Sequence, residues 1–309
     1  MKIHVSVPAT CANLGPGFDV FGAAIGLRNN FSVETLGRGM KTAFAIKGIS
    51  CPIPSDRTNL FYRAFRKTLN SAMPVRITIE NNIPCRSGLG SSATAVTAGI
   101  ICAMLIKQGR LRADDEAFRL DVAGAAIKME GHPDNVAPAL LGGLCLSYKS
   151  GSGYGFRKIC IPRDIMPVIV YPHIEKRSTK HTRKLLPQRV LMKDAVFNIS
   201  RAALLVFSFA GGNIQPLREA MEDRLHQDVR LRFYPHCRSA IDKLIFLGAG
   251  GAALSGSGPA IIAIWKGVPD MKVVEREMRN IFFRSGITVD VYFPGFMNHG
   301  ADYKIIHNH

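Results

Sequence analysis

The chain has 309 residues, of which 47% are hydrophobic and 20% charged, a composition that excludes disordered and fibrous proteins and allows a large core. Its length favours two domains over one. The formal net charge is +17, but the basic residues are spread along the chain without an aromatic-rich basic motif, so we expect no nucleic-acid partner.

The sequence also argues against a membrane protein and a disulfide scaffold. No apolar run approaches the roughly 20 residues of a spanning helix, and the N-terminus begins directly as a strand. We therefore expect a cytoplasmic protein with no membrane partner. Seven cysteines are scattered without a Cys-x-x-Cys pair, which indicates neither a disulfide framework nor a zinc site and favours reduced thiols.

The first half of the chain alternates predicted strands and helices. Alternating apolar residues predict strands, and apolar residues at helical spacing predict helices. In chain order we predict strands over residues 1–5, 31–35, 42–46 and 75–80, and helices over 59–71, 95–106 and 114–130. The apolar stretch 136–146 is expected to be partly a strand, and the Gly/Ser-rich residues 149–155 form a hairpin tip.

A buried strand over residues 166–171 opens the second half, and we place the domain boundary just before it. The predicted domains are therefore 1–160 and 161–309. In chain order we then predict a loop entering a helix over 175–184, helices over 194–209, 214–223, 238–245 and 271–284, and strands over 261–265 and 288–293. His307 and His309 near the end are assigned no role.

A glycine- and serine-rich segment, Pro84–Thr94, links a predicted strand to a predicted helix. Glycines let the backbone approach an anion, and the free N–H groups at a helix start point toward it. Gly88–Ala93 formally matches the dinucleotide pattern G-x-G-x-x-A, but several residues separate it from the strand, and no acidic residue follows at the expected distance. No Gly-Lys-Ser/Thr follows the glycines, which excludes a Walker A loop.

Polar side chains gather in two turns. Asn13 and Asp19 lie among glycines and prolines in residues 8–19, and a second turn, Glu130–Asn135, places four polar groups where Pro133 ends a helix. Such residues often bond only their own backbone, but four together beside an apolar stretch favour a site. The glycine-rich segment 247–260 is either a tight hairpin or a place of close ligand approach.

Three segments now stand in order along the chain: Pro8–Asp19, Gly88–Ala93 and Leu254–Pro259. Together they resemble the three signature motifs of the GHMP kinases, the galacto-, homoserine, mevalonate and phosphomevalonate kinases. The first segment and the string His132–Ala139 resemble those of homoserine kinases in particular. Because the motifs span almost the whole chain, the resemblance is more specific than that of a single glycine-rich loop.

The resemblance implies an α+β fold with two domains, the first like domain 2 of ribosomal protein S5 and the second ferredoxin-like. It implies transfer of the γ-phosphate of ATP to the side-chain hydroxyl of L-homoserine, a step toward threonine. ATP and Mg²⁺ are the implied cofactors, L-homoserine and ATP are the small-molecule partners, and we expect a homodimer.

The resemblance also implies the residues of the site. Those expected to bind ATP are Pro84, Arg86, Ser87, Gly88, Leu89, Gly90, Ser91, Ser92, Ala93 and Thr94 at the phosphates and Asn59 and Leu60 near the adenine. Those expected to bind the amino acid are Asn13, Asp19, His132, Asn135, Arg183, Arg230 and Gly256. Ser92 and Glu130 resemble magnesium ligands, and Asn13, Glu130 and Asn135 are the expected catalytic residues.

The chemistry of these residue types is consistent with that substrate. Arg183 and Arg230 offer bidentate forks for an amino-acid carboxylate, and Asp19 and Asn13 offer oxygens for its ammonium. Magnesium prefers oxygen ligands and keeps several waters, so that one carboxylate and one hydroxyl are enough. Phosphoryl transfer depends mainly on positioning and on charge neutralisation.

The turn Asp134–Asn135 bears on the mechanism. In mevalonate-type relatives an aspartate in this turn is interpreted as the base, whereas here Asn135 stands at the matching position. We therefore hypothesise that no side chain abstracts the homoserine proton. Two alternatives stay open: a GHMP kinase that acts on another small alcohol such as mevalonate, and a basic RNA-associated protein.

Overall fold

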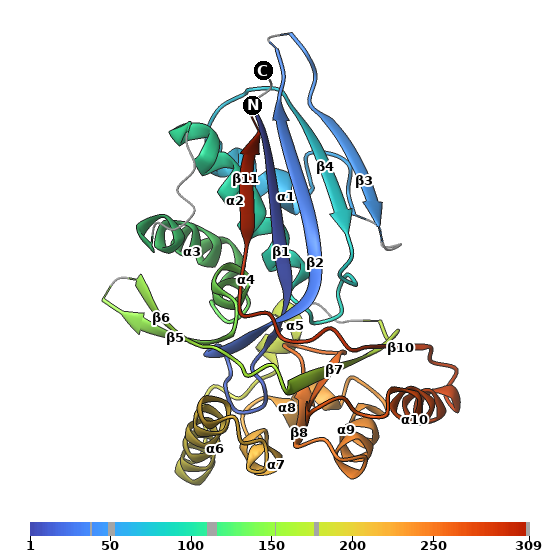
Figure 1. The fold of residues 1–309 in the computed structure, drawn as a ribbon. Helices are drawn as coiled ribbons and strands as arrows, with labels where there is room; N and C mark the ends of the chain where they lie inside the picture. The colour runs from blue at the N-terminus through green and yellow to red at the C-terminus, as the bar shows by residue number, and fades with distance from the viewer. Residues whose placement is uncertain (38, 49–52, 110–115, 152, 176–178, 307–309) are drawn as a thin grey trace.

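The structure is a computed structural model that describes residues 1–37, 39–48, 53–109, 116–151, 153–175 and 179–306. In these ranges two β-sheets stand one above the other with helices against them (Figure 1). The fold class is α+β, as predicted. Cys51, the predicted helix start at Asp114 and Asp115, and His307 and His309 lie outside the described residues.

The first sheet has seven strands. In chain order they are β1 (Lys2–Ala12), β2 (Phe21–Thr35), β3 (Ala43–Gly48), β4 (Val75–Asn81), β5 (Leu144–Ser150), β6 (Gly153–Ile159) and β11 (Asp302–Ile306). The strand order is β11-β1-β2-β4-β3, with β5 paired to β2 and to β6. The pair β3–β4 is parallel, whereas β1, β2 and β11 pair antiparallel.

Helices cover one face of this sheet: α1 (Leu60–Leu69), α2 (Ser91–Gln108), α3 (Glu116–Glu130) and α4 (Val136–Leu141). Every second residue of β1 (Ile3, Val5 and Val7) is buried against them, as expected where successive side chains point to opposite faces. Phe61 and Phe65 of α1 lie in the same core. This core holds the start of α2, and with it the glycine-rich segment, at one end of the sheet.

The second sheet has the strand order β10-β7-β9-β8 and is antiparallel throughout. Its strands are β7 (Ile165–Pro172), β8 (Gly251–Leu254), β9 (Ile261–Lys266) and β10 (Val289–Tyr292). Helices follow β7 and β9, so the chain order is β-α-β-β-α-β, the ferredoxin-like arrangement that was predicted.

Helices pack on both faces of this sheet. They are α5 (Thr179–Lys184), α6 (Met192–Gly211), α7 (Leu217–Ala220), α8 (Gln227–Leu231), α9 (Cys237–Phe246) and α10 (Met271–Phe283). Residues from α9 and α10 share a core with one face of β7 and β9, while residues from α6 and α7 share a core with the other. The second of these cores also takes in Ala9 and Cys11 of β1, so that one apolar core joins the two sheets.

The stretch 136–146 is partly a strand, as predicted, because β5 begins at Leu144. Its first part, residues 136–141, is the helix α4, in which Pro138 lies in the first turn, where a proline costs no hydrogen bond. Two other predictions need correction. The predicted helix 214–223 shrinks to the four residues of α7, since the chain turns to place Asp223 in a polar network described below. The strand β11 was not predicted, and it returns the end of the chain to the first sheet. The domain boundary at 160/161 stays a prediction.

Two further expectations fail in part. By length and composition α2 and α6 are each apolar enough to cross a membrane, although 61% of the α2 window is buried inside the protein and only 22% of the α6 window. Cys85 is disulfide-bonded, so the expectation that the cysteines are reduced thiols is wrong for this residue. Cys11, Cys102, Cys145, Cys160 and Cys237 are free.

Candidate active site

A cavity of about 380 Å³ lies where the two halves of the chain meet. It is bordered by the turn after β1, the glycine-rich segment before α2, the turn after α3 and the loop between β8 and β9. The residues that line it are Asn13, Asp19, Arg86, Ser87, Gly88, Leu89, Gly90, Ser91, Ser92, Ala93, Glu130, His132, Asp134, Asn135, Arg183, Arg230, Gly256 and Ser257. Segments from across the whole sequence therefore share one site.

The glycine-rich segment is anchored through its carbonyl groups. The Ser87 oxygen accepts from the Ala260 N–H at 2.9 Å, and the Leu89 oxygen accepts from the Thr10 N–H at 3.1 Å. The Gly88 oxygen accepts from the Ser255 hydroxyl at 2.8 Å. Because these three carbonyl groups bond to residues outside the glycine-rich segment, the backbone of the segment is held in position beside the cavity.

The start of α2 carries no side-chain cap. Gly90 is the N-cap with a φ of 69°, and as a glycine it offers no side chain to cap the N–H groups of the first turn. An uncapped helix start leaves N–H groups and the positive end of the helix dipole for an anion. A side chain at Gly90 would not fit, because its Cβ would lie 1.9 Å from the Thr10 hydroxyl oxygen. The first turn of α2 is therefore suited to hold a phosphate.

Ser92 and Glu130 meet at the edge of this loop. The Ser92 hydroxyl donates to the Glu130 carboxylate at 2.8 Å. Burial raises the pKa of Glu130, an effect that the hydrogen bond from Ser92 and the charge of His132 oppose. A hydroxyl and a carboxylate side by side fit a magnesium ion that keeps most of its water ligands. No larger cluster of metal-binding side chains occurs among the described residues.

The turn after α3 is tied together by Asp134. Its carboxylate bonds to the His132 ring Nδ1 at 2.6 Å and accepts from the Asn135 amide at 3.2 Å. The Asn135 oxygen in turn accepts from the Thr10 hydroxyl at 2.8 Å. Asp134 is only 4% exposed. Burial alone lowers the pKa of His132, but the hydrogen bond to Asp134 and the nearby carboxylates outweigh burial, so that this pKa lies above its usual value.

Asp19 and Arg183 form a two-point ion pair across the cavity. The Arg183 Nη1 and Nη2 atoms donate to the two Asp19 oxygens at 2.5 and 2.7 Å. Asp19 lies 164 positions before Arg183 in sequence, so the pair ties the first turn to α5. The guanidinium also lies over the Phe18 ring, 5.1 Å from its centre. The hydrogen bond to Asp19 raises the pKa of Arg183.

Arg230 enters the cavity from α8 and is almost completely buried, with 2% exposure. Its Nη1 donates to the Gly256 oxygen at 2.8 Å and to the His226 Nδ1 at 3.0 Å. Its Nε has no partner. The Asn13 amide donates to the same Gly256 oxygen at 3.0 Å. A buried guanidinium with a donor still unpaired is suited to bind an anionic group of a ligand.

His226 sets the orientation of Arg230. Arginine has only donors, so the His226 Nδ1 must accept, and its Nε2 carries the proton that it donates to the Gly15 oxygen at 2.8 Å. Burial lowers the pKa of His226, which agrees with a neutral ring. The ring therefore connects the first turn to α8.

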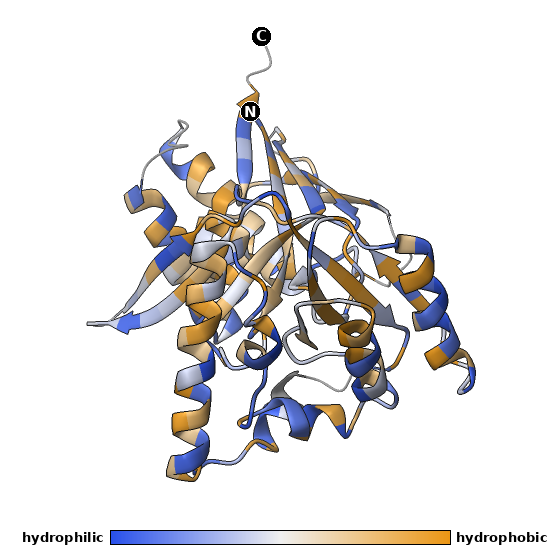
Figure 2. Cartoon of the chain, turned by 60° about the horizontal axis from the view of Figure 1, so that its bottom comes forward, coloured by the Kyte–Doolittle hydropathy of each residue, from blue (hydrophilic) through white to orange (hydrophobic). Residues whose placement is uncertain are grey.

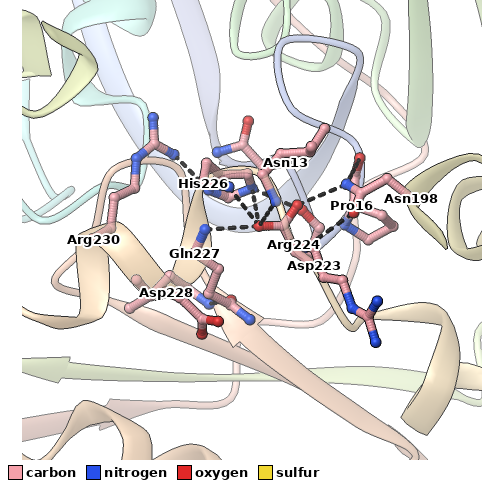
Figure 3. A network of polar contacts seen from close by, with 12 residues as sticks. Asn13, Pro16, Asn198, Asp223, Arg224, His226, Gln227, Asp228 and Arg230 are labelled. Carbon is pink, nitrogen blue, oxygen red and sulfur yellow. Dashed lines mark hydrogen bonds and ion pairs between the residues drawn. The ribbon is translucent and has the colours of Figure 1, made fainter. Parts of the chain in front are cut away.

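Asp223 organises the chain around this histidine (Figure 3). One carboxylate oxygen accepts the N–H groups of Leu225, His226 and Gln227 at 3.2, 2.8 and 2.7 Å. The other accepts from the Asn198 amide of α6 at 2.8 Å. That amide also donates to the Pro16 oxygen at 3.3 Å. The start of α8, α6 and the first turn are thereby held in one network.

Comparison with known proteins identifies the family of this chain. A family model described as GHMP kinases N terminal domain matches residues 59–143, and one described as GHMP kinases C terminal matches residues 201–283. A homoserine kinase of Aquifex aeolicus is 40% identical over 266 residues, which are 85% of this chain and 86% of that protein. The chain belongs to the GHMP kinase family. A homoserine kinase of Nostoc punctiforme is 37% identical over 303 residues, 97% of each chain.

Solved structures share the fold of this GHMP kinase. The crystal structure of homoserine kinase from Cytophaga hutchinsonii has a TM-score of 0.83 and 26% identity, and the match covers 98% of this chain and 97% of that chain. L. major mevalonate kinase in complex with R-mevalonate has a TM-score of 0.66 at 16% identity over 94% of this chain and 95% of that chain, a likeness of fold alone. Membership of a kinase family implies that ATP is the phosphoryl donor.

Most of the residues predicted for the site of this GHMP kinase line the cavity, and four do not. Asn59 is 1% exposed and caps α1, where its side chain accepts from the Tyr62 N–H at 3.2 Å. Leu60 is 41% exposed outside the cavity. The Pro84 oxygen accepts from the Ser87 hydroxyl, and Thr94 is buried with its hydroxyl on the Ser91 oxygen. Pro84 and Thr94 therefore bond within the glycine-rich segment and support it without lining the cavity.

Sequence reasoning missed the residues that position the site of this GHMP kinase. They are Phe18, Asn198, Asp223 and His226. One signal was present: His226 and Arg230 are four residues apart, a spacing that places them on the same face of a helix. The contact of Phe18 with Arg183 and Arg230, whose guanidinium carbons lie 5.1 and 5.2 Å from the ring centre, carries no such signal.

The His132–Asp134 pair gives this GHMP kinase a pH-dependent stability. Because the folded pKa of His132 is raised, the pair stabilises fully below the pKa of a free histidine, about 6.5, and its contribution is lost as pH rises through the folded pKa. We expect His132→Gln to cost about 1.5–3 kcal/mol near pH 6 and clearly less near pH 9. Urea unfolding across this range measures the difference.

The matched control is His173→Gln, which removes the exposed partner of Asp290. It should change the free energy of unfolding by less than about 0.5 kcal/mol at any pH. An effect of His132→Gln that stays constant from pH 6 to pH 9 would contradict the assigned ion pair.

Proposed function

We propose that this GHMP kinase transfers the γ-phosphoryl group of ATP to the side-chain hydroxyl of L-homoserine. The observation that carries the proposal is the pairing of two ends in one cavity. One end is an uncapped helix start, and the other is a set of charged side chains, the half-buried Asp19 and Arg183 and the buried Arg230. The first end suits phosphates and the second suits a zwitterionic amino acid. The names of the relatives reported above support the same reaction.

At the end of the cavity that we propose binds the amino acid, the charged side chains already bond to other groups of the protein when no substrate is bound. Asp19 and Arg183 neutralise each other, and Arg230 keeps an unpaired Nε. We infer that the substrate carboxylate bonds to Arg230 and Arg183 and that the ammonium bonds to Asp19. Exchange of the Asp19–Arg183 pair for pairs with the substrate keeps the charges of the cavity balanced and gives the buried Arg230 an anionic partner.

The phosphate end is proposed to position the ATP phosphates on the first turn of α2. Ser92 and Glu130 would hold magnesium, which neutralises phosphate charge when bound. Residues Gly88 to Ser92 line the cavity, and a backbone with glycines allows close approach of the phosphates. The loop and the helix dipole then stabilise the charge that develops on the transferred group.

We further propose that no side chain acts as the general base. Asp134 is a carboxylate that lines the cavity, and it already bonds to His132 and Asn135. We therefore expect Asp134→Asn to lower kcat less than about tenfold, whereas loss of a general base costs about 10²–10⁴-fold. Steady-state kinetics with saturating substrates measures this. A fall of a hundredfold or more with unchanged KM values would show that Asp134 is the base.

The substrate assignment is tested by a coupled assay of ADP formation with L-homoserine or mevalonate as acceptor. We expect turnover with L-homoserine and a kcat/KM at least about 10³-fold lower with mevalonate, since mevalonate has no ammonium to bond to Asp19. Comparable turnover with mevalonate would contradict the role of Asp19. Nucleic-acid binding that falls steeply with salt, together with no ATP turnover, would instead support the RNA-associated alternative.

We place the reaction in the cytoplasm and propose that the protein acts as a homodimer. The net charge of +17 is consistent with attraction of the anionic nucleotide to the cavity.

A further inference from the structure

A second cavity, of about 610 Å³, lies beside the first sheet. It is bordered by β1 and β2, by α3 and the end of α4, by β6 and by the segment that leads into β11. Among the described residues, none lines both this cavity and the candidate active site. In Figures 1 and 2 the hairpin of β5 and β6 stands at the left edge of the molecule, and the cavity lies at the base of this hairpin.

The close approach of two main-chain segments builds one wall of this second cavity. A Cβ atom at Gly300 would lie 2.3 Å from the carbonyl group of Leu140. A Cβ atom at Gly142 would lie 2.6 Å from main-chain atoms of Asn298 and His299. Only glycine permits contacts this short. The segment before β11 is therefore held against the end of α4 by its backbone, and the wall does not depend on flexible side chains.

Arg28 of β2 is half-buried in this cavity and is oriented by uncharged partners. Its Nε donates to the Ser6 hydroxyl at 2.8 Å, and its Nη2 donates to the carbonyl oxygens of Ser6 and Gly300 at 2.8 and 3.0 Å. Within the described chain its Nη1 has no hydrogen-bond partner. Burial lowers the pKa of Arg28, and the charge of Asp302 offsets this effect only in part. The guanidinium is thus fixed in position without an ion pair.

Lys158 lies at the base of the β5–β6 hairpin and has the same kind of surroundings. Its Nζ donates to the carbonyl oxygens of Leu141 and Asn298 at 3.2 and 2.9 Å. An ammonium group has three donors, so one remains for a ligand. In the part of the chain that the structure describes, Lys158 forms no ion pair. Arg28 and Lys158 are therefore two cations that line one cavity and lack an anion.

The charges of the lining favour a ligand with two negative charges. Arg28 and Lys158 carry one positive charge each. Asp302 is the one carboxylate of the described lining, and it is exposed, so that water screens its charge. A phosphate monoester carries a charge of about −1.5 to −2 at neutral pH and has three acceptor oxygens. Its charge therefore complements that of the two cations.

We propose that this cavity binds the phosphate group of a small phosphorylated molecule between Arg28 and Lys158. The Arg28 Nη1 and the third Lys158 proton donate to the phosphate oxygens, and such charge-assisted hydrogen bonds are stronger than those to neutral groups. Cavities of about 300–1,000 Å³ hold small-molecule ligands, so that there is room for an organic group beside the phosphate. The proposal does not rest on the identity of the phosphoryl acceptor, because the two cavities share no described residue.

The test is a calorimetric titration of the full-length protein with glycerol 3-phosphate and, separately, with inorganic phosphate at constant ionic strength. A non-hydrolysable ATP analogue and magnesium are present at saturation, so that the phosphate loop is occupied. We expect glycerol 3-phosphate to bind with a dissociation constant of about 1 mM or lower. Binding of neither probe at concentrations up to about 20-fold higher would overturn the site. Binding of inorganic phosphate alone would overturn the assignment to a phosphate ester.

Three variants locate the bound phosphate. Lys158→Gln should raise the dissociation constant of glycerol 3-phosphate at least ~10-fold, since a charged donor is lost. Lys149→Gln is the matched control: it makes the same change of charge at an exposed position of the neighbouring strand β5, outside the cavity, and should change the dissociation constant less than about twofold. Asp302→Asn should lower the dissociation constant about threefold, because it removes a negative charge from the lining.

The Asp302→Asn result separates a binding site from a purely structural role of these side chains, because a structural role gives no reason for tighter binding. Circular dichroism checks that each variant is folded. A Lys158→Gln protein that binds glycerol 3-phosphate as tightly as the natural chain would show that the phosphate binds elsewhere and would overturn the proposal. Weaker binding by Asp302→Asn would contradict it as well.

Discussion

Glu130→Gln is expected to lower kcat by about 10²–10³-fold while the KM for L-homoserine changes little. Glu130 bonds to the Ser92 hydroxyl at 2.8 Å at the edge of the phosphate loop. Glutamine keeps the size of the side chain and removes the charge that a magnesium ion needs. Assays at several magnesium concentrations should show that the variant needs much more magnesium for half-maximal rate.

Two comparisons make this result specific. Ser92→Ala should raise the magnesium requirement in the same direction but by less, since a neutral ligand is lost. Asp121→Asn, an exposed position on the same helix α3, should leave both quantities within about twofold. A Glu130→Gln enzyme with kcat within tenfold and an unchanged magnesium requirement would show that Glu130 is not a metal ligand.

The pKa of Glu130 adds a pH dependence to this prediction. Burial raises this pKa, so the protonated, neutral form persists to higher pH than for an exposed glutamate. Magnesium binds the deprotonated form, and its apparent affinity should therefore fall as pH is lowered through the raised pKa. The same titration performed on Glu130→Gln should lack this fall.

Arg230→Lys is expected to raise the KM for L-homoserine by about 10²-fold or more and to leave the KM for ATP within about threefold. The natural guanidinium bonds at Nη1 to His226 and Gly256 and still has a free Nε. Lysine keeps the charge but is a single point donor, so that it cannot hold these partners and a substrate carboxylate together.

The control for this variant is Arg232→Lys, an exposed arginine just beyond the end of α8. Its kinetic constants should match those of the natural enzyme. A buried arginine also supports the fold. The thermal unfolding temperature of Arg230→Lys is therefore measured as well, with saturating ATP. A KM for ATP that rises as much as the KM for L-homoserine would show general damage to the cavity rather than loss of the carboxylate contact.

The local chemistry of the site could be predicted from the sequence. Glycines and serines before an apolar helical run indicate an anion site because backbone approach and helix-start N–H groups depend on a few consecutive residues. The same holds for the turn Glu130–Asn135, where Pro133 ends α3. Nearly all the residues chosen on these grounds and by resemblance line the cavity.

Contacts between distant residues could not be predicted. The strand β11 pairs with β1 across the whole chain, and such a pairing depends on which sheet edge is free rather than on the five residues of the strand. The helix α6 shows the same limit: its apolar residues are visible in the sequence, but only packing decides that Leu205 and Phe209 are the ones buried in the core.

The sequence by itself determined the α+β class, the phosphate loop and the charged side chains that the cavity uses. The tertiary structure decided which of those side chains pair with one another and how they are oriented. Asp19 faces Arg183 across 164 residues, and Asp223, which has no visible role in the sequence, fixes the start of α8 so that His226 orients Arg230. The physical reason is that loop and helix propensities act over neighbouring residues, whereas charge pairing and burial depend on distances that only the folded chain sets.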